Sequence, residues 1–229
     1  MKTITPYNSV ILYEKTRIQP IDIDGAATTM LIVSAIEAFI NDVVAYYETI
    51  SSAECGMGDN FRKGVVRTTD GDWLVMTDSE HNLLDTLAKI QFGSTRLEQK
   101  LIDVSLALGS GHIKKGCNPY QGFQALLSIR NQLVHAKSVP LVVDEDKKID
   151  MSSYPKVVKN LIQNKTITNN NGVQNSWIYA LDSKEYTMWC RSIFLEISVG
   201  LLDFLPSSSV SQFFKSEYKN SFGWVDVQP

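Results

Sequence analysis

Arg130, Asn131 and His135 are of residue types that could carry out acid–base chemistry on a phosphate ester. Arginine is a permanent planar cation that suits the charge developing on a phosphate in a transition state. Histidine titrates near physiological pH and can accept or donate a proton. The asparagine could orient either side chain through a hydrogen bond. This set needs no metal ion, and the sequence contains no HExxH motif and only three histidines.

These residues lie on a predicted helix over 118–137. Asn118 is placed to cap it, with Pro119 at the first helical position and Gln121 at the capping-box position. At about 100° per residue, apolar side chains fill one broad arc of the helix, and Arg130 falls in the middle of it. A polar stripe runs beside the arc and contains Gln124, Ser128, Asn131 and His135. A charge on an apolar face is costly unless it is paired. Two interpretations stay open: a structural ion pair near a surface histidine, or an arginine and a histidine that share a cleft.

A carboxylate partner for Arg130 is expected on a second strongly periodic segment, a predicted helix over about 25–50. Glu37 lies at the edge of its apolar arc, and we expect it to face inward and hold the guanidinium of Arg130. Asp42 and Asp85 are rival partners. The alternative role of Glu37 is that of a solvated or salt-bridged surface residue.

The segment 109–116 joins two predicted helices immediately before the arginine-bearing one. It lacks the GxxxxGK[ST] pattern, so it does not indicate a nucleoside triphosphate site. Lys114 and Lys115 could attract a phosphate backbone, and His112 could supply a second proton carrier. The alternative is a flexible connection whose lysines are solvated.

The Arg130–His135 pattern, R-N-x-x-x-H late in a helix after an apolar run, resembles the signature of the HEPN superfamily (higher eukaryotes and prokaryotes nucleotide-binding). Residues Ser34–Asp42 are similar to a HEPN first helix, and Trp189–Glu196 to its closing helix. The resemblance covers roughly residues 25–205. It implies an all-α helical bundle.

The resemblance also implies a metal-independent endoribonuclease of toxin, anti-phage defence or RNA-processing type. Members commonly form homodimers in which two Arg/His motifs make one composite cleft. His135 would then assist attack of the ribose 2′-OH on the adjacent phosphate or protonate the leaving oxygen, Arg130 would stabilise the charged transition state, and Asn131 would position them. Such a reaction leaves a cyclic phosphate and cannot use DNA, which lacks the 2′-OH.

The sequence departs from one toxin subgroup of that superfamily. Lys137 stands where that subgroup has a tyrosine modified by its antitoxin, so this mode of silencing is not expected here. An antitoxin or regulatory protein of another kind is an expected partner. The alternative function is a catalytically silent HEPN-like module that binds nucleotide, RNA or a protein, with Arg130 and His135 in structural roles.

Composition indicates an ordinary globular protein. Of 229 residues, 44% are hydrophobic and 21% charged, and the net charge of −3 means that any nucleic-acid site must be local. The three cysteines, Cys55, Cys117 and Cys190, form no CxxC pair and suit a reducing cytoplasm. No signal peptide is evident, and charges such as Glu37 and Asp42 interrupt the longest apolar stretches, so no membrane span is expected. No cofactor or metal is expected.

The predicted organisation has three parts: an N-terminal arm over 1–24, the helical domain over 25–205 and a C-terminal aromatic tail over 206–229. Loop or β insertions are expected at about 51–77 and 138–180. Within them we predict a hairpin of Val65–Thr68 with Trp73–Met76 around Asp70-Gly71, a strand over Val173–Tyr179 pairing with Leu141–Val143, and a short helix after Pro155. Asp182 to Glu185 has capping-box spacing and opens the last long helix. The fold class is therefore all-α with small β-hairpin insertions.

Overall fold

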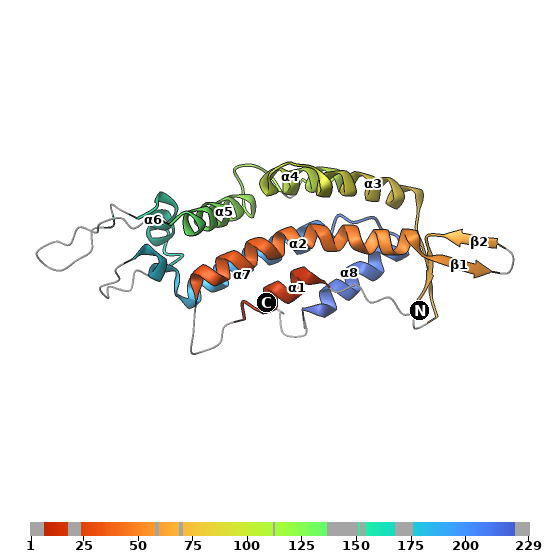
Figure 1. Cartoon of the computed structure of the whole chain (residues 1–229), viewed down its shortest axis with the longest axis horizontal. Coiled ribbons are helices and arrows are strands. Elements are labelled where there is room, and N and C mark those ends of the chain that lie inside the picture. Colours follow the sequence, from red (N-terminus) through yellow and green to blue (C-terminus); the bar gives the residue numbers. More distant parts are fainter. Residues whose placement is uncertain are drawn as a thin grey trace, which may run out of the picture. The chain divides into compact units, whose positions relative to one another are not determined.

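A computed structural model shows that the chain is mainly helical, with two small antiparallel β-hairpins, which confirms the predicted fold class (Figure 1). The structure describes residues 7–17, 24–57, 60–68, 71–111, 113–136, 151, 154–167 and 176–222. The chain divides into two units. Unit 1 consists of residues 1–11, 36–114 and 197–229, and unit 2 of residues 12–35 and 115–196.

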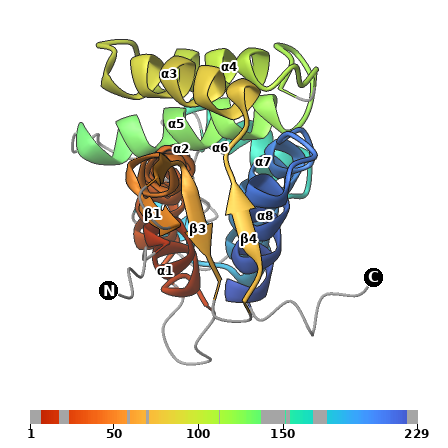
Figure 2. The same cartoon turned by 90° about the vertical axis from the view of Figure 1, so that its right-hand side faces the viewer.

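Three helices contribute residues to both units: α1 (Asn8–Glu14), α2 (Gly25–Ser52) and α7 (Lys184–Leu202). Unit 1 further contains β1 (Glu54–Met57), β2 (Asn60–Lys63), β3 (Val65–Arg67), β4 (Trp73–Val75), α3 (Asp78–Phe92), α4 (Leu97–Ala107) and α8 (Ser209–Ser221). Unit 2 further contains α5 (Tyr120–Val134), α6 (Lys156–Gln163) and the 3₁₀ helix η2 (Trp177–Leu181). Figure 2 shows α3 and α4 side by side, and within unit 1 strand β4 packs against α8.

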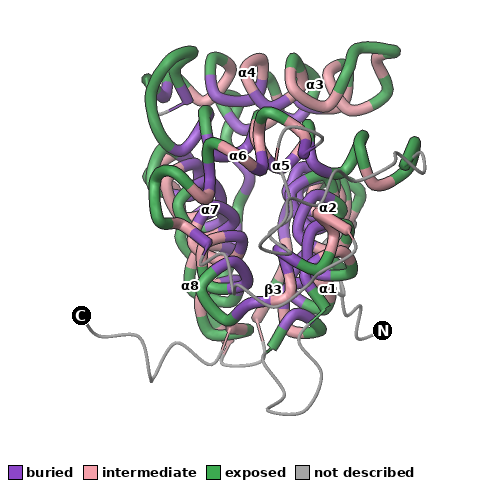
Figure 3. The backbone as a smooth tube through the Cα atoms, turned by 90° about the vertical axis from the view of Figure 1, so that its left-hand side faces the viewer, coloured by how far each residue is buried: buried purple, intermediate pink, exposed green. Residues whose placement is uncertain are grey.

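Helix α2 contributes many of the buried side chains. Its part in unit 1 buries a stripe made of Ile36, Phe39, Ile40, Val43, Val44 and Tyr47. Figure 3 colours the buried positions of the backbone purple. By length and composition alone α2 could cross a membrane, contrary to the expectation that charges interrupt every such stretch. However, 61% of its most apolar 18-residue window is buried within the protein, as in a core helix.

A buried carboxylate, that of Glu80, connects the starts of helices α3 and α8. The backbone N–H of Thr77 donates to Glu80 Oε2 (2.9 Å), which closes a capping box at the start of α3. The hydroxyl groups of Ser208, the N-cap of α8, and of Ser211, in its first turn, donate to Glu80 Oε1, Ser211 at 2.5 Å. Ser211 is also hydrogen-bonded to the Tyr47 hydroxyl of α2 (2.7 Å). One side chain therefore organises two helix N-termini against α2.

A second buried carboxylate, that of Asp42, caps helix α1. It accepts hydrogen bonds from the backbone N–H of Asn8 (3.2 Å) and Ser9 (2.9 Å) and from the Ser9 hydroxyl (2.5 Å). The Ser9 hydroxyl is also hydrogen-bonded to the Tyr218 hydroxyl of α8 (2.6 Å). Burial raises the pKa of Asp42, and the hydrogen bonds from Ser9 and Asn8 oppose that rise. Asp42, a rival partner for Arg130 in the sequence, is thus committed to α1.

In unit 2 a carboxylate again meets a helix start. Asp182 Oδ1 accepts from the backbone N–H of Gly25, the first residue of α2 (2.8 Å). Only glycine fits there, because a Cβ would lie 2.2 Å from the Leu181 carbonyl oxygen. The Ser183 hydroxyl, rather than Asp182, accepts from a backbone N–H in the first turn of α7, that of Tyr186 (3.1 Å). The predicted helix start is therefore confirmed with a different capping residue.

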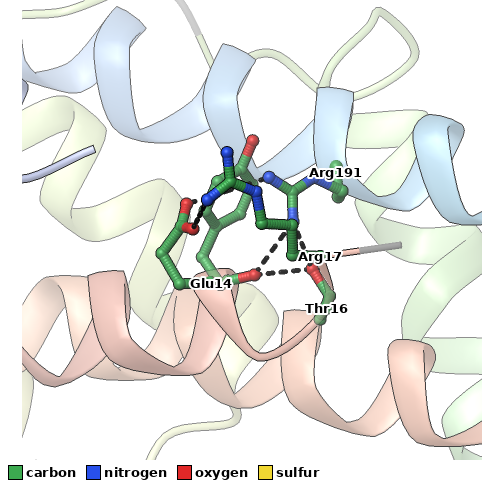
Figure 4. A network of polar contacts seen from close by, with 5 residues as sticks. Glu14, Thr16, Arg17 and Arg191 are labelled. Atoms are coloured by element: carbon green, nitrogen blue, oxygen red, sulfur yellow. Dashed lines mark hydrogen bonds and ion pairs between the residues drawn. The ribbon is translucent and has the colours of Figure 1, made fainter. Parts of the chain in front are cut away.

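Arg191 of α7 holds the other end of α1 (Figure 4). Its Nη1 donates to the Tyr13 carbonyl (3.1 Å) and to the Thr16 hydroxyl (2.9 Å). Its guanidinium carbon lies 3.9 Å from the centroid of the Tyr13 ring. The Glu14 carboxylate forms two ion pairs. Its Oε1 lies 3.9 Å from Nη2 of Arg191, and its Oε2 lies 3.8 Å from Nη1 of the exposed Arg17. A cation thus occupies the negative end of the helix, where the helix dipole favours it.

The C-terminal segment expected as a tail contributes to the core of unit 1. Residues 209–221 form α8, in which Phe214 and Tyr218 are fully buried. Likewise, α1 lies inside the predicted N-terminal arm over 1–24 and is anchored at both ends.

The insertions are partly as expected. The hairpin is confirmed as β3–β4, and the helix after Pro155 as α6, but the preceding hairpin β1–β2 was missed. The predicted strand over 173–179 is wrong where the structure describes it, because Trp177–Leu181 form η2, with the Ser176 hydroxyl accepting from the Ile178 N–H. Its expected partner, Leu141–Val143, lies outside the described residues.

Replacing Glu80 tests the role of its carboxylate. Burial by itself raises the pKa of this group, but hydrogen bonds from Ser208, Ser211 and Thr77 outweigh it, so the pKa lies below its ordinary value of 4.5. A carboxyl group whose pKa is lower in the folded than in the unfolded state stabilises the fold at pH values above its pKa in the unfolded chain. This stabilisation is lost as the pH falls through its pKa in the folded state.

We therefore expect Glu80→Gln to lower the free energy of unfolding at pH 7 by about 1–3 kcal/mol in urea titrations. The difference from the wild type should narrow below about pH 4. Glu48→Gln, at an exposed position of α2, is the matched control and should change little. Equal stability of the Glu80 variant and the control at pH 7 would contradict this role.

Candidate active site

Helix α5 carries the Arg130–His135 motif and begins later than predicted. Tyr120 is its first residue and Pro119 its N-cap, without a side-chain capping hydrogen bond, so the expected cap at Asn118 and capping box at Gln121 are wrong. Instead, the carbonyl of Cys117 accepts from the Gln121 N–H (3.0 Å). Proline at the N-cap has no side-chain acceptor, which explains why the expected capping pattern is absent.

The first three turns of α5 are fixed by packing in unit 2. Phe123, Leu126 and Ile129 are fully buried. Gly122 faces Ile193 of α7 so closely that a Cβ would lie 2.7 Å from Ile193 Cδ1. This close approach sets α5 against α7, and α6 packs beside α5.

The last turn of α5 is not covered in this way, and this changes the interpretation of Arg130. Every residue from Arg130 to Ala136 is exposed except Leu133, which is half-buried. Val134 is 55% exposed although it belongs to the predicted apolar arc. The expectation that Arg130 points into the protein is therefore wrong. Its angular position matches that of buried residues one and two turns earlier, but no described part of the chain covers the helix there.

Asn131 contacts both ends of the motif. Arg130 Nη1 donates to Asn131 Oδ1 (3.2 Å), and the backbone N–H of His135 donates to the Asn131 carbonyl (3.1 Å). Among the described residues, no further hydrogen bond or ion pair engages the side chain of Arg130 or His135. The predicted polar stripe is confirmed as a surface stripe: Gln124, Ser128, Asn131 and His135 are all exposed. A guanidinium and an imidazole with free hydrogen-bonding groups can receive a phosphate.

The two key side chains of one subunit do not converge on their own. Five positions along a regular helix correspond to about 7.5 Å of rise and about 140° of rotation. His135 terminates α5 at φ −110° and ψ 24°, so it sits at the helix edge. A phosphate bound by Arg130 would therefore lie on a different side of the helix from the imidazole of His135 in the same chain. A phosphate bound at this motif could therefore also be contacted by side chains of a second protein surface.

Glu37 does not take its predicted inward position. It is exposed on α2, one residue beyond the buried Ile36, where the helix has already turned about 100° away from the packed stripe. No ion pair of Glu37 or Arg130 occurs within the part of the chain that the structure describes. The second rival, Asp85, is exposed as well. The supporting ion pair proposed from the sequence therefore has no structural counterpart.

The loop before α5 presents its lysines to solvent. Lys114 and Lys115 are exposed, which permits contact with a phosphate backbone, while His112 lies outside the described residues. Cys117 is exposed and Cys190 buried. Across the described ranges no three His, Cys, Asp or Glu side chains gather as metal ligands would. A small cavity in unit 1 is lined by apolar side chains such as Phe39, Leu87 and Leu201 and contains no group that could act chemically.

Comparison with known proteins gives no relative for this chain. No protein-family model, no curated protein and no solved structure matches it. The resemblance of the Arg130–His135 motif to the HEPN superfamily therefore stays a prediction that depends on the motif and the helix that carries it.

The exposure of the motif has a direct consequence for stability. We expect Arg130→Ala, Asn131→Ala and His135→Ala to change the free energy of unfolding by no more than about 0.5 kcal/mol, because exposed side chains without buried partners contribute little. Urea or thermal unfolding of the purified variants measures this. A loss above about 1.5 kcal/mol for Arg130→Ala would show instead that its guanidinium forms a structural ion pair.

Proposed function

We propose that this protein is a metal-independent endoribonuclease that uses Arg130 and His135 in a composite site formed by two copies of the chain. The observation that carries the proposal is the exposure of Arg130, Asn131 and His135 at the C-terminal end of α5, with Asn131 hydrogen-bonded to both key residues. A histidine buried and satisfied within one subunit would have favoured a structural role.

In the proposed reaction the ribose 2′-oxygen attacks the adjacent phosphorus, and the bond from phosphorus to the 5′-oxygen breaks. His135 of one copy takes the proton of the 2′-OH, and His135 of the second copy, in its protonated form, donates a proton to the leaving 5′-oxygen. Arg130 stabilises the additional negative charge on the phosphoryl oxygens, and Asn131 positions the guanidinium. The products are a 2′,3′-cyclic phosphate and a free 5′-hydroxyl group.

A second copy answers two chemical requirements. A single imidazole cannot be both neutral base and protonated acid in one step, whereas two can. The divergence of Arg130 and His135 around α5 also leaves one side of a bound phosphate without a protein group. Val134 offers an exposed apolar contact beside the motif for the same face of a second α5. Isologous contacts of this kind are typical of twofold dimers.

The negative net charge of the chain supports a second candidate function. With a net charge of −3, the surface has no overall attraction for polyanions. A silent module that binds a nucleotide or a protein through the same exposed motif would fit that charge. The two candidates differ in one outcome, which is whether the phosphodiester bond is broken.

Cleavage of a labelled single-stranded RNA in the presence of EDTA tests the proposal. We expect the wild type to cut it and to leave a cyclic phosphate, and Arg130→Ala or His135→Ala to reduce the rate at least about 100-fold. Gln132→Ala, an exposed residue between the two, is the matched control and should keep full activity. An RNA with a single 2′-deoxy substitution at the cut site should resist cleavage there.

Activity that needs a divalent metal, or that survives both substitutions, would refute this mechanism. Binding of RNA without cleavage by the wild type would favour the silent module.

A further inference from the structure

The β3–β4 hairpin of unit 1 presents an ordered outer face. Along β4, Leu74 is 5% exposed, whereas Trp73 is 39% and Val75 50% exposed. This is the alternation of a strand with one buried and one open face. Leu74 anchors the hairpin, and β4 packs against α8 (Figure 2). The outer face is therefore held in place by the inner one.

Arg67 and Trp73 lie directly opposite each other on this hairpin. The guanidinium carbon of Arg67 is 5.6 Å from the centroid of the Trp73 ring, a cation–π distance. Arg67 Nε also donates to the Gly71 carbonyl (3.2 Å), in the turn where Gly71 has φ +96°. Arg67 is exposed. An exposed planar cation thus lies within cation–π distance of an indole and is hydrogen-bonded to the backbone of the turn.

We propose that the Arg67–Trp73 pair is a binding site for single-stranded RNA, in which a base stacks on the pair and its phosphate contacts the guanidinium. Bases stack on aromatic rings and on arginine planes with little dependence on sequence, because every base has a π face. The same guanidinium offers N–H donors and a positive charge to a phosphate. Few ligands combine a flat apolar ring with an adjacent anion, and a nucleotide unit does so.

The site deepens the proposed function by naming an unpaired strand as the substrate class. Only the choice of RNA as the natural ligand rests on that function, because stacking and phosphate contacts do not need the 2′-OH. A single-stranded DNA oligonucleotide therefore serves as a probe that binds without being cleaved. This separates binding at the hairpin from chemistry at Arg130 and His135.

The test measures fluorescence anisotropy of a labelled single-stranded DNA oligonucleotide with the full chain and its variants. We expect Trp73→Ala to weaken binding about 5-fold or more, the effect of losing one stacked base, and Trp73→Phe to retain most of the affinity. Arg67→Gln should weaken binding and reduce the slope of log K against log salt by about 0.7, as one phosphate contact is lost. Arg67→Lys should keep the salt slope but bind more weakly than the wild type.

The matched control is Phe92→Ala, which removes an aromatic side chain that is 77% exposed on α3 and has no cation–π partner among the described residues. It should bind like the wild type. Thermal unfolding checks each variant, because cross-strand pairs also stabilise hairpins. If Trp73→Ala unfolds the hairpin, the Trp73→Phe and Arg67→Gln variants still decide the question.

The proposal is overturned if the wild type does not bind the oligonucleotide, or if the Trp73 and Arg67 variants bind as Phe92→Ala does. It is also overturned if polyglutamate of equal charge displaces the probe as well as unlabelled oligonucleotide does, since the site would then recognise charge alone. Repeating the assay with RNA and the His135→Ala variant should give the same ranking. Loss of cleavage activity in other assays would leave these binding results unchanged.

Discussion

Carboxylates placed at helix N-termini by distant parts of the chain are the interactions on which this structure depends. Asp42 caps α1, Asp182 meets the start of α2, and Glu80 connects the starts of α3 and α8. The first N–H groups of a helix have no partner within it and carry partial positive charge. A carboxylate inside a protein is costly unless it is hydrogen-bonded. The helix N–H groups gain an acceptor and the carboxylate gains donors, so these contacts fix where the helices begin within each unit.

The candidate chemistry lies where this packing ends. Gly122 and Ile129 hold the body of α5 in unit 2, but the turn that follows is open to solvent. An exposed guanidinium and imidazole contribute little to folding, and the contacts of both residues with Asn131 favour a role in a site. The end of one helix cannot enclose a phosphate. We therefore infer that the site is completed by a second copy of the same turn.

Local patterns in the sequence predicted much of this fold, but they did not reveal the contacts between residues far apart in the chain. The apolar period of α2 and the turn residues Asp70-Gly71 identify a helix and a hairpin without further information. Periodicity gives the direction in which Arg130 points, but not whether another element covers it, and this is why its burial was predicted wrongly. The carboxylate contacts join residues such as Glu80 and Ser211, 131 positions apart, which no spacing rule reveals. Counting outward from the predicted Asp70-Gly71 turn places Arg67 opposite Leu74, one position away from its observed partner Trp73, so the sequence alone did not predict that pair.

The most direct test of the composite site is the activity of a mixed dimer. A heterodimer of one wild-type and one His135→Ala subunit, isolated through two different affinity tags, contains a single intact motif. If one histidine acts as base and that of the second subunit as acid, this heterodimer should cleave single-stranded RNA no faster than the His135→Ala homodimer. Half of the wild-type activity would contradict the account, because it would show that each subunit carries a complete site of its own.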